Sequence, residues 1–146
     1  MGIRVENVTK TVGGITKLDN VSLEVNDGDF SVLLAPTGSG KTTLLRLLAG
    51  IEKPTSGRIY FDDQDVTDLS VQKRHIAMVY QQFINYPSMT IYENIASPLR
   101  VAKKYSKEEI DKKVRSNAEL LGIDQVLKHL PEEVSGGQQQ RTAIAR

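Results

Sequence analysis

The chain has 146 residues, of which 39% are hydrophobic and 25% charged, and its formal net charge is +1 at pH 7. This composition is typical of a soluble globular domain, and so small a charge gives no reason to expect nucleic-acid binding through a basic surface. The absence of cysteine excludes disulfides and thiolate metal sites. No apolar run approaches the ~20 residues that cross a bilayer, and the N-terminus lacks the apolar core of a signal peptide. We therefore expect a cytoplasmic protein without direct membrane insertion.

The first quarter of the chain predicts a β-hairpin. Apolar and polar residues alternate over 3–8 and again over 21–25, which is typical of half-buried strands. Between them, Gly13 and Gly14 tolerate the positive φ angles that tight hairpin turns require.

Two later segments, 30–34 and 76–80, are continuously apolar. Such runs are expected for strands that are buried on both faces of a sheet. A further strand is predicted at 58–61, after a break at 54–57 that contains proline and glycine.

The segment between the predicted strand 30–34 and a predicted helix at 41–49 has the pattern of a P-loop. Its small residues let backbone N–H groups turn inward on a phosphate, and the helix adds the positive end of its dipole. Lys41 is expected to reach the β- and γ-phosphates, and the Thr42 hydroxyl to bind Mg²⁺. The alternative is a glycine-containing turn that only starts a helix. The residues of this candidate cradle are Ala35, Pro36, Thr37, Gly38, Ser39, Gly40, Lys41, Thr42 and Thr43.

The first position of this cradle is Ala35, where the P-loop pattern asks for glycine. An alanine there disturbs the loop only if the position needs a positive φ, or if the methyl group crowds the phosphate.

The second half of the chain predicts helices. Thr90 with Glu93, and Ser106 with Glu109, fit the capping-box pattern, so one helix is expected to begin after each serine or threonine. Ser135, followed by Gly136 and Gly137, precedes another helix-favouring run. This motif is either a second anion site or an ordinary N-cap.

The order of these motifs resembles the ATP-binding subunits of ABC transporters: a P-loop, then Gln81 after a predicted buried strand, then Ser-Gly-Gly-Gln-Gln-Gln-Arg at 135–141. Residues 78–100 are most similar to subunits of sugar and polyol importers. The resemblance implies an α/β fold, with a P-loop NTPase core whose mixed sheet carries N-terminal antiparallel strands, and a helical subdomain. It places the core at 1–82, the helical subdomain at 83–134, and the signature motif with the start of its helix at 135–146.

The resemblance also implies the cofactors and the roles of the site residues. ATP and Mg²⁺ would bind the cradle, and Gln81 of the Q-loop would join Thr42 as a ligand of Mg²⁺ and sense the γ-phosphate. Gln81 and Lys41 would be the catalytic residues. The adenine would lie beside Val12, which cannot stack on it as an aromatic ring would. In a head-to-tail dimer, the ATP of the partner subunit would be contacted by Ser135, Gly136, Gly137 and Gln138.

The segment Gln82–Met89 would face transmembrane permease subunits and hold the protein at the inner face of the cell membrane. An exposed apolar patch of Phe83, Ile84, Tyr86 and Met89 would mark that interface. The alternative is that these side chains pack the helical subdomain onto the sheet.

The chain stops at Arg146, before the positions where the family has its Walker B aspartate, catalytic glutamate and switch histidine. We therefore expect a C-terminally truncated domain that hydrolyses ATP poorly by itself, because hydrolysis depends on metal positioning and an oriented water. The resemblance implies an ATP-binding subunit that energises an ABC transporter and the import of a sugar or polyol across the cytoplasmic membrane. Two alternatives are a non-catalytic nucleotide-binding remnant and a soluble ABC-type ATPase.

Overall fold

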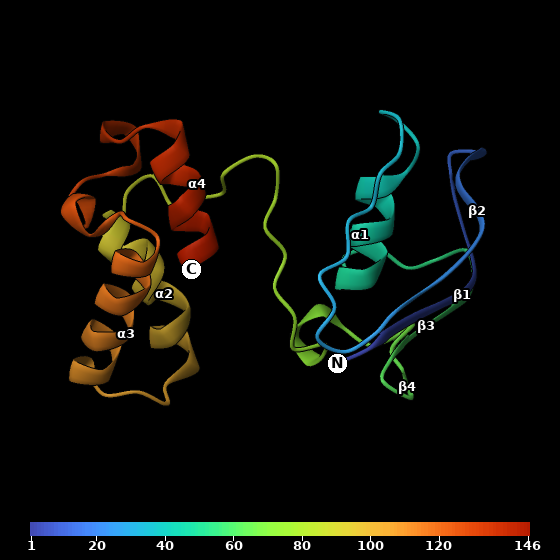
Figure 1. Ribbon diagram of the computed structural model, residues 1–146, viewed down its shortest axis with the longest axis horizontal. Helices are drawn as coiled ribbons and strands as arrows, with labels where there is room; N and C mark the ends of the chain where they lie inside the picture. The colour runs from blue at the N-terminus through green and yellow to red at the C-terminus, as the bar shows by residue number, and fades with distance from the viewer. The chain divides into compact units, whose positions relative to one another are not determined.

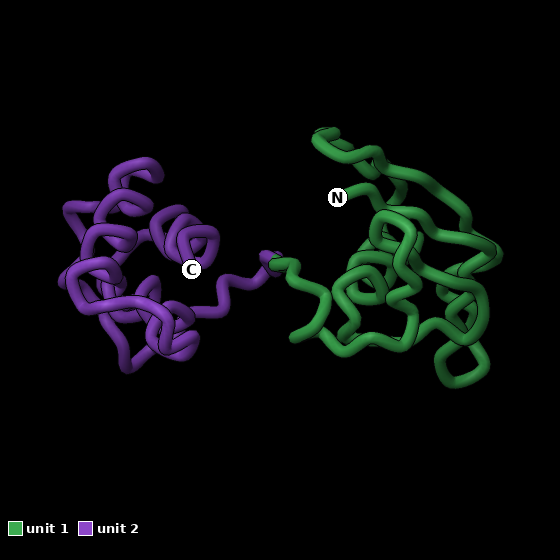
Figure 2. Tube along the Cα trace, turned by 90° about the horizontal axis from the view of Figure 1, so that it is seen from below, with its two compact units in different colours: residues 1–78 green, residues 79–146 purple.

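The computed structural model describes residues 1–146 as two compact units, 1–78 and 79–146 (Figure 2). Unit 1 contains the predicted P-loop and unit 2 the predicted signature motif. Each unit is described by itself.

Unit 1 is a four-stranded antiparallel sheet with one α-helix (Figure 1). Its strand order is β2-β1-β3-β4. The strands are β1 (Ile3–Val12), β2 (Ile15–Val25), β3 (Ser56–Phe61) and β4 (Gln64–Asp65), and the helix is α1 (Lys41–Ala49), with a 3₁₀ turn at Val71–Lys73.

The predicted hairpin is confirmed. β1 pairs with β2 from Ile3↔Val25 to Val12↔Ile15, and the turn residues Gly13 and Gly14 have φ angles of 56° and 78°. This geometry matches the right-handed twist of the flanking strands.

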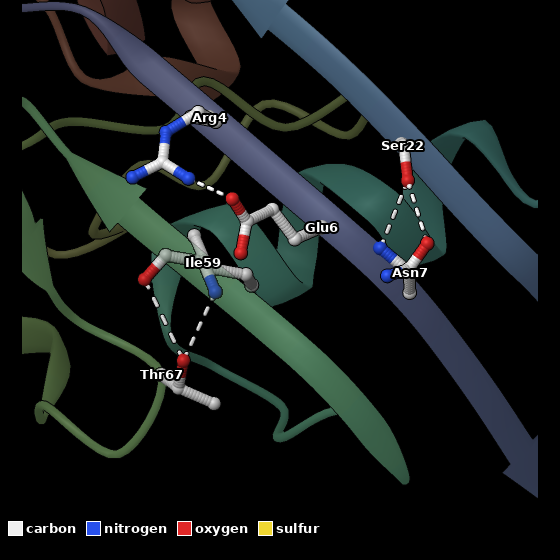
Figure 3. A network of polar contacts seen from close by, with 6 residues as sticks. All are labelled: Arg4, Glu6, Asn7, Ser22, Ile59 and Thr67. Carbon is white, nitrogen blue, oxygen red and sulfur yellow. Dashed lines mark hydrogen bonds and ion pairs between the residues drawn. The ribbon is translucent and has the colours of Figure 1, made fainter.

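A bulge in β1 is held by side chains rather than by the ladder (Figure 3). Asn7 has a φ of 49°, its N–H donates to Ser22 Oγ at 2.9 Å, and that hydroxyl contacts Asn7 Oδ1 at 3.3 Å. A side chain also bonds to the backbone of β3: the Oγ1 of Thr67 accepts from the N–H of Ile59 at 2.9 Å. These bonds satisfy donors that the interrupted ladder leaves free.

The core of unit 1 lies between α1 and one face of the sheet. α1 presents Leu44 and Leu47, which are three residues apart and therefore share a helix face. The cluster of buried side chains comprises Val5, Val8, Leu18, Leu44, Leu47, Ile59, Phe61 and Val66.

The prediction of buried strands at 30–34 and 76–80 is wrong for this structure, in which neither run is a strand. Phe30 is 94% exposed and Leu34 is 85% exposed. A strand buried on both faces needs hydrogen-bonded neighbours, and no strand in residues 1–146 pairs with either run. The sheet seen here is therefore the antiparallel part of the mixed sheet that was expected.

Unit 2 consists of three α-helices and two 3₁₀ turns, the turns lying at Asp124–Val126 and Pro131–Glu133. The helices are α2 (Ile91–Ala102), α3 (Lys107–Leu120) and α4 (Gly136–Ala145). Their apolar faces meet in a second core, formed by Ile91, Ile95, Ala96, Ile110, Val114, Ala118, Ile123 and Leu127. None of the helices is both long and apolar enough to traverse a bilayer.

The helix starts predicted from capping boxes are confirmed. Thr90 Oγ1 accepts from the Glu93 N–H at 3.2 Å, and the Glu93 carboxylate accepts from the Thr90 N–H at 2.9 Å. Ser106 and Glu109 form the same reciprocal pair at the start of α3. Each box satisfies two N–H groups that a helix start otherwise leaves unpaired.

Candidate functional site

The candidate cradle before α1 contains two glycines in left-handed backbone conformations. Gly38 and Gly40 have φ angles of 85° and 89°, in the left-handed region that favours glycine. A β-carbon on residue 40 would lie 2.5 Å from the carbonyl oxygen of Lys17 and 2.7 Å from Leu18 Cδ2, whereas one on residue 38 would meet nothing within 4 Å. Glycine is therefore required at position 40 for two reasons: the backbone has a positive φ, and β2 leaves no room for a side chain.

Ala35 is not among the residues with positive φ. Alanine is thus compatible with the backbone at this position, where the P-loop pattern has glycine.

The N-terminus of α1 is open to an anion. Its N-cap is Gly40, with no side-chain cap and no acidic residue in the first turn. The first N–H groups of a helix have no intrahelical partner, and here no side chain of the cap satisfies them. With the positive end of the helix dipole, they favour a negative ligand.

Lys41 lies folded back over the loop. Its Nζ donates to the carbonyl oxygens of Ala35 at 2.5 Å and Pro36 at 2.6 Å, and contacts Ser39 Oγ at 3.5 Å. The ammonium group is therefore held beside the open amides, where it adds positive charge to the same cradle.

A magnesium ion in this cradle would have Thr42 as its protein ligand. Thr42 is exposed in the first turn of α1, and no group of three or more acidic or histidine side chains gathers anywhere to hold a metal. Mg²⁺ in proteins keeps waters and takes one or two protein oxygens with phosphate oxygens. A hydroxyl beside an anion cradle fits that donor set.

The signature motif forms the N-terminus of α4 and is a well-made helix cap. Ser135 Oγ accepts from the Gln138 N–H at 3.3 Å. Gln138 Oε1 in turn accepts from the Ser135 N–H at 2.9 Å and from its hydroxyl at 3.1 Å. The predicted N-cap is confirmed, and an anion here would compete with the Gln138 side chain for the serine hydroxyl.

The remaining predicted residues are exposed in two different units. Val12 is 50% exposed at the end of β1 in unit 1, and Gln81 is exposed in a non-helical segment of unit 2. Within unit 1 the structure gathers the cradle residues 35–43, and within unit 2 it gathers 135–138.

The segment 82–89 combines exposed apolar side chains with a backbone held by hydrogen bonds. Phe83, Ile84 and Tyr86 are 39%, 50% and 46% exposed, while Met89 is half-buried. Phe83 also lies against α4, since its Cε2 is 3.6 Å from a β-carbon placed on Gly136. Phe83 therefore packs in part against a helix of its own unit, which is neither of the two roles expected from the sequence.

Two asparagines that sequence reasoning missed hold this segment in place. Asn94, fully buried, accepts from the Tyr86 N–H at 2.7 Å and donates to the carbonyl oxygens of Met89 and Thr90 at 3.0 Å. Asn85 Nδ2 donates to the Gln139 carbonyl oxygen in α4 at 3.0 Å. The available signal was an asparagine on the apolar face of a helix, between Ile91 and Ile95.

Curated relatives align with almost the whole chain. It is 47% identical to the trehalose/maltose import ATP-binding protein of Thermococcus litoralis and 42% identical to the α-glucoside transport ATP-binding protein of Rhizobium meliloti, over 99% of the chain in each case. It is 43% identical to the sn-glycerol-3-phosphate import ATP-binding protein of Yersinia pestis, again over 99% of the chain. The chain spans 40% of the length of each of these relatives.

Solved structures of ABC transporter cassettes have the same fold. A dimeric bacterial ABC transporter cassette matches with a TM-score of 0.88 and 36% identity, and a dimeric post-hydrolysis cassette bound to ADP and Pi with 0.87 and 35%. Each match covers 98% of this chain and 67% of the solved one. The fold class expected from the sequence is thereby confirmed.

The sequence profile described as "ABC transporter" matches residues 18–146, which include both the cradle and the signature motif. The resemblance to sugar and polyol importer subunits is confirmed by the relatives above. The chain belongs to the ABC transporter family.

Proposed function

We propose that this chain binds Mg-ATP as part of the ATP-binding subunit of an ABC transporter that imports a sugar or polyol. The observation that carries the proposal is the uncapped N-terminus of α1, with Lys41 held beside it. Such a helix start binds phosphate through its backbone N–H groups.

In this proposal, the amides of residues 38–43 hold the β- and γ-phosphates. The Lys41 ammonium leaves the carbonyl oxygens of Ala35 and Pro36 to bind phosphate oxygens, and Thr42 binds Mg²⁺. Gln81 contacts the metal and the γ-phosphate, and Val12 lies beside the adenine.

A second subunit completes the site. Ser135, Gly136, Gly137 and Gln138 contact ATP held by that subunit in a head-to-tail dimer. The dimeric cassettes with similar folds support this arrangement, and one of them holds ADP and Pi. The proposed division remains a core at 1–82, a helical subdomain at 83–134 and the signature segment at 135–146.

The membrane subunits dock on residues 82–89, at the inner face of the cell membrane. The support is the exposure of Phe83, Ile84 and Tyr86 on a backbone fixed by Asn94 and Asn85. Exposed apolar side chains on a preorganised backbone lose little entropy when a partner covers them.

The class of solute is proposed from the relatives alone. Those at 42–48% identity are named for trehalose/maltose, α-glucosides, sn-glycerol 3-phosphate, osmoprotective compounds and Fe(3+) ions. Because similarity in this region hardly changes with the solute, selection of the solute belongs to other parts of the assembly.

Titration of the chain with the fluorescent analogue mant-ATP and Mg²⁺ tests the nucleotide site. We expect the wild type and the Lys112→Ala control to bind, since Lys112 is exposed on α3, and Lys41→Ala to lose binding at least about tenfold, as a charged phosphate ligand is removed. Equal binding by Lys41→Ala would refute the assignment.

A further inference from the structure

Arg74 is a buried cation without an acidic partner. Its residue surface is 3% exposed, and none of the ion pairs of the structure includes it. Burial lowers the pKa of its guanidinium, which stays charged at physiological pH nonetheless. A buried charge is strongly unfavourable unless hydrogen bonds compensate for the lost water, so its bonding partners explain why it is tolerated.

All four partners are backbone carbonyl oxygens from two separate segments. The Nη1 atom donates to Leu47 and Leu48 in the last turn of α1, both at 2.8 Å. The Nε and Nη2 atoms donate to Leu69 at 3.0 Å and Thr67 at 3.1 Å, after β4. The planar guanidinium thus joins the end of α1 to the chain that follows the sheet.

The end of α1 is suited to a cation. The last four carbonyl groups of a helix have no intrahelical partner, and they carry the negative end of the helix dipole. Arg74 supplies two hydrogen bonds and a full positive charge at the C-terminus of α1. The proposed phosphates lie at its N-terminus.

The guanidinium also has a fixed place. Gly50, the C-cap of α1, has a φ of 76°, and a β-carbon there would lie 2.5 Å from Arg74 Nε and 2.9 Å from Cζ. The Phe61 ring lies on another side, with its centroid 5.9 Å from Cζ. The glycine leaves just enough room for the arginine against the helix end.

α1 has nine residues, the first three of which belong to the cradle, so a displacement at its C-terminus is carried to its N-terminus, about 12 Å away at 1.5 Å per residue. Apolar packing through Leu44 and Leu47 is non-directional, whereas hydrogen bonds to two carbonyl groups fix the helix along its own axis.

We propose that Arg74 is a positioning residue for nucleotide binding: it fixes the axial position of α1 and thereby aims the amides of the P-loop at the phosphates. This inference rests on the proposed function. It deepens that function by adding a determinant of affinity that does not itself touch the nucleotide.

The test measures mant-ATP affinity in Mg²⁺ and the melting temperature in the same preparations. Arg74→Lys keeps the charge and most of the stem but cannot span both segments, so we expect the dissociation constant to rise about tenfold. Gly50→Ala, which displaces the guanidinium, is expected to act in the same direction. Val5→Ala is the matched control, because it destabilises the same core from the sheet side and is expected to change affinity less than about twofold.

Unchanged affinity in Arg74→Lys would overturn the inference, and so would an equal loss in Val5→Ala at the same fall in melting temperature. Arg74→Met, if it folds, should bind more weakly still. If the wild type itself fails to bind, the proposed function is wrong. If the wild type and Arg74→Lys bind mant-ATP equally well while Lys41→Ala does not bind it, only the role of Arg74 is rejected.

Discussion

The N-termini of α1 and α4 both lie in glycine-containing motifs, yet their caps are opposite. α1 starts at Gly40 with no side-chain cap, whereas α4 starts at Ser135 in a complete capping box with Gln138. The first N–H groups of α1 have no side-chain acceptor in the cap, whereas at α4 the Ser135 hydroxyl accepts a hydrogen bond from one such group. Under the proposed function, the caps therefore distinguish the main phosphate site at α1 from the auxiliary one at α4.

With glycine as its N-cap, the open start of α1 has a stability cost of only a few tenths of a kcal/mol relative to a good N-cap. The structure offsets it at other places on the same helix. Leu44 and Leu47 are buried in the core of unit 1, and Arg74 satisfies the carbonyl groups at the far end. An uncapped helix start is thus possible because the rest of α1 is firmly held.

The largest effect is expected from closing the cradle of α1 with a methyl group. Gly40→Ala combines an unfavourable φ with contact to the Lys17 carbonyl oxygen, so we expect a loss of about 1–2 kcal/mol from the dihedral angle and about 1–3 kcal/mol more from overpacking. Gly38→Ala has a similar φ and open space, so it should show only the first loss. Thermal denaturation of both variants separates the loss of stability caused by the dihedral angle from the loss caused by overpacking. Equal losses of stability in the two variants would mean that β2 does not constrain the loop.

An intermediate effect is expected at α4. Ser135→Ala removes the cap and should cost about 1 kcal/mol. Ser106→Ala removes the corresponding capping box from α3, where the partner is Glu109 in place of Gln138, and is the matched control. Both should lower stability alike, but only Ser135→Ala should reduce ATP hydrolysis in the assembled transporter, by about tenfold or more. An equal effect of both variants on hydrolysis would leave Ser135 with a capping role alone.

The smallest effect concerns pH. Neither α1 nor α4 has an acidic residue in its first turn, so neither start should respond to mild acid. In unit 1, hydrogen bonds from the side chain and backbone of Thr67, and then from Arg58, lower the pKa of Asp65 to about 2. Because the folded pKa lies below the ordinary value of 3.8, the stabilisation is present above pH 4 and is lost as pH falls towards 2.

Asp65→Asn should therefore lower the melting temperature slightly at pH 7, and the difference from wild type should vanish near pH 2. Melting curves across that range measure it. A difference that persists at pH 2 would show that Asp65 acts by something other than its charge.

Features set by neighbours in the sequence were predictable. The capping boxes at Thr90 and Ser106 depend on residues within four positions, and both were confirmed. The segments 30–34 and 76–80 were read as strands from their composition, but strand formation requires a partner that lies far away in the chain.

The same reason explains why the contacts of Arg74 and Asn85 could not be predicted. Arg74 contacts carbonyl groups 26 and 27 residues earlier, and Asn85 contacts one 54 residues later. Nothing in the local pattern around either residue indicates such a contact, because only the tertiary fold creates it.

The resting position of Lys41 has a thermodynamic consequence for the ligand. A free lysine side chain loses up to about 2 kcal/mol of rotamer entropy when it is immobilised. Here the carbonyl oxygens of Ala35 and Pro36 already restrain it before any nucleotide arrives, so most of that loss belongs to folding. Under the proposed function, exchanging one set of oxygen acceptors for another would give the triphosphate a preorganised cation at little cost in conformational entropy.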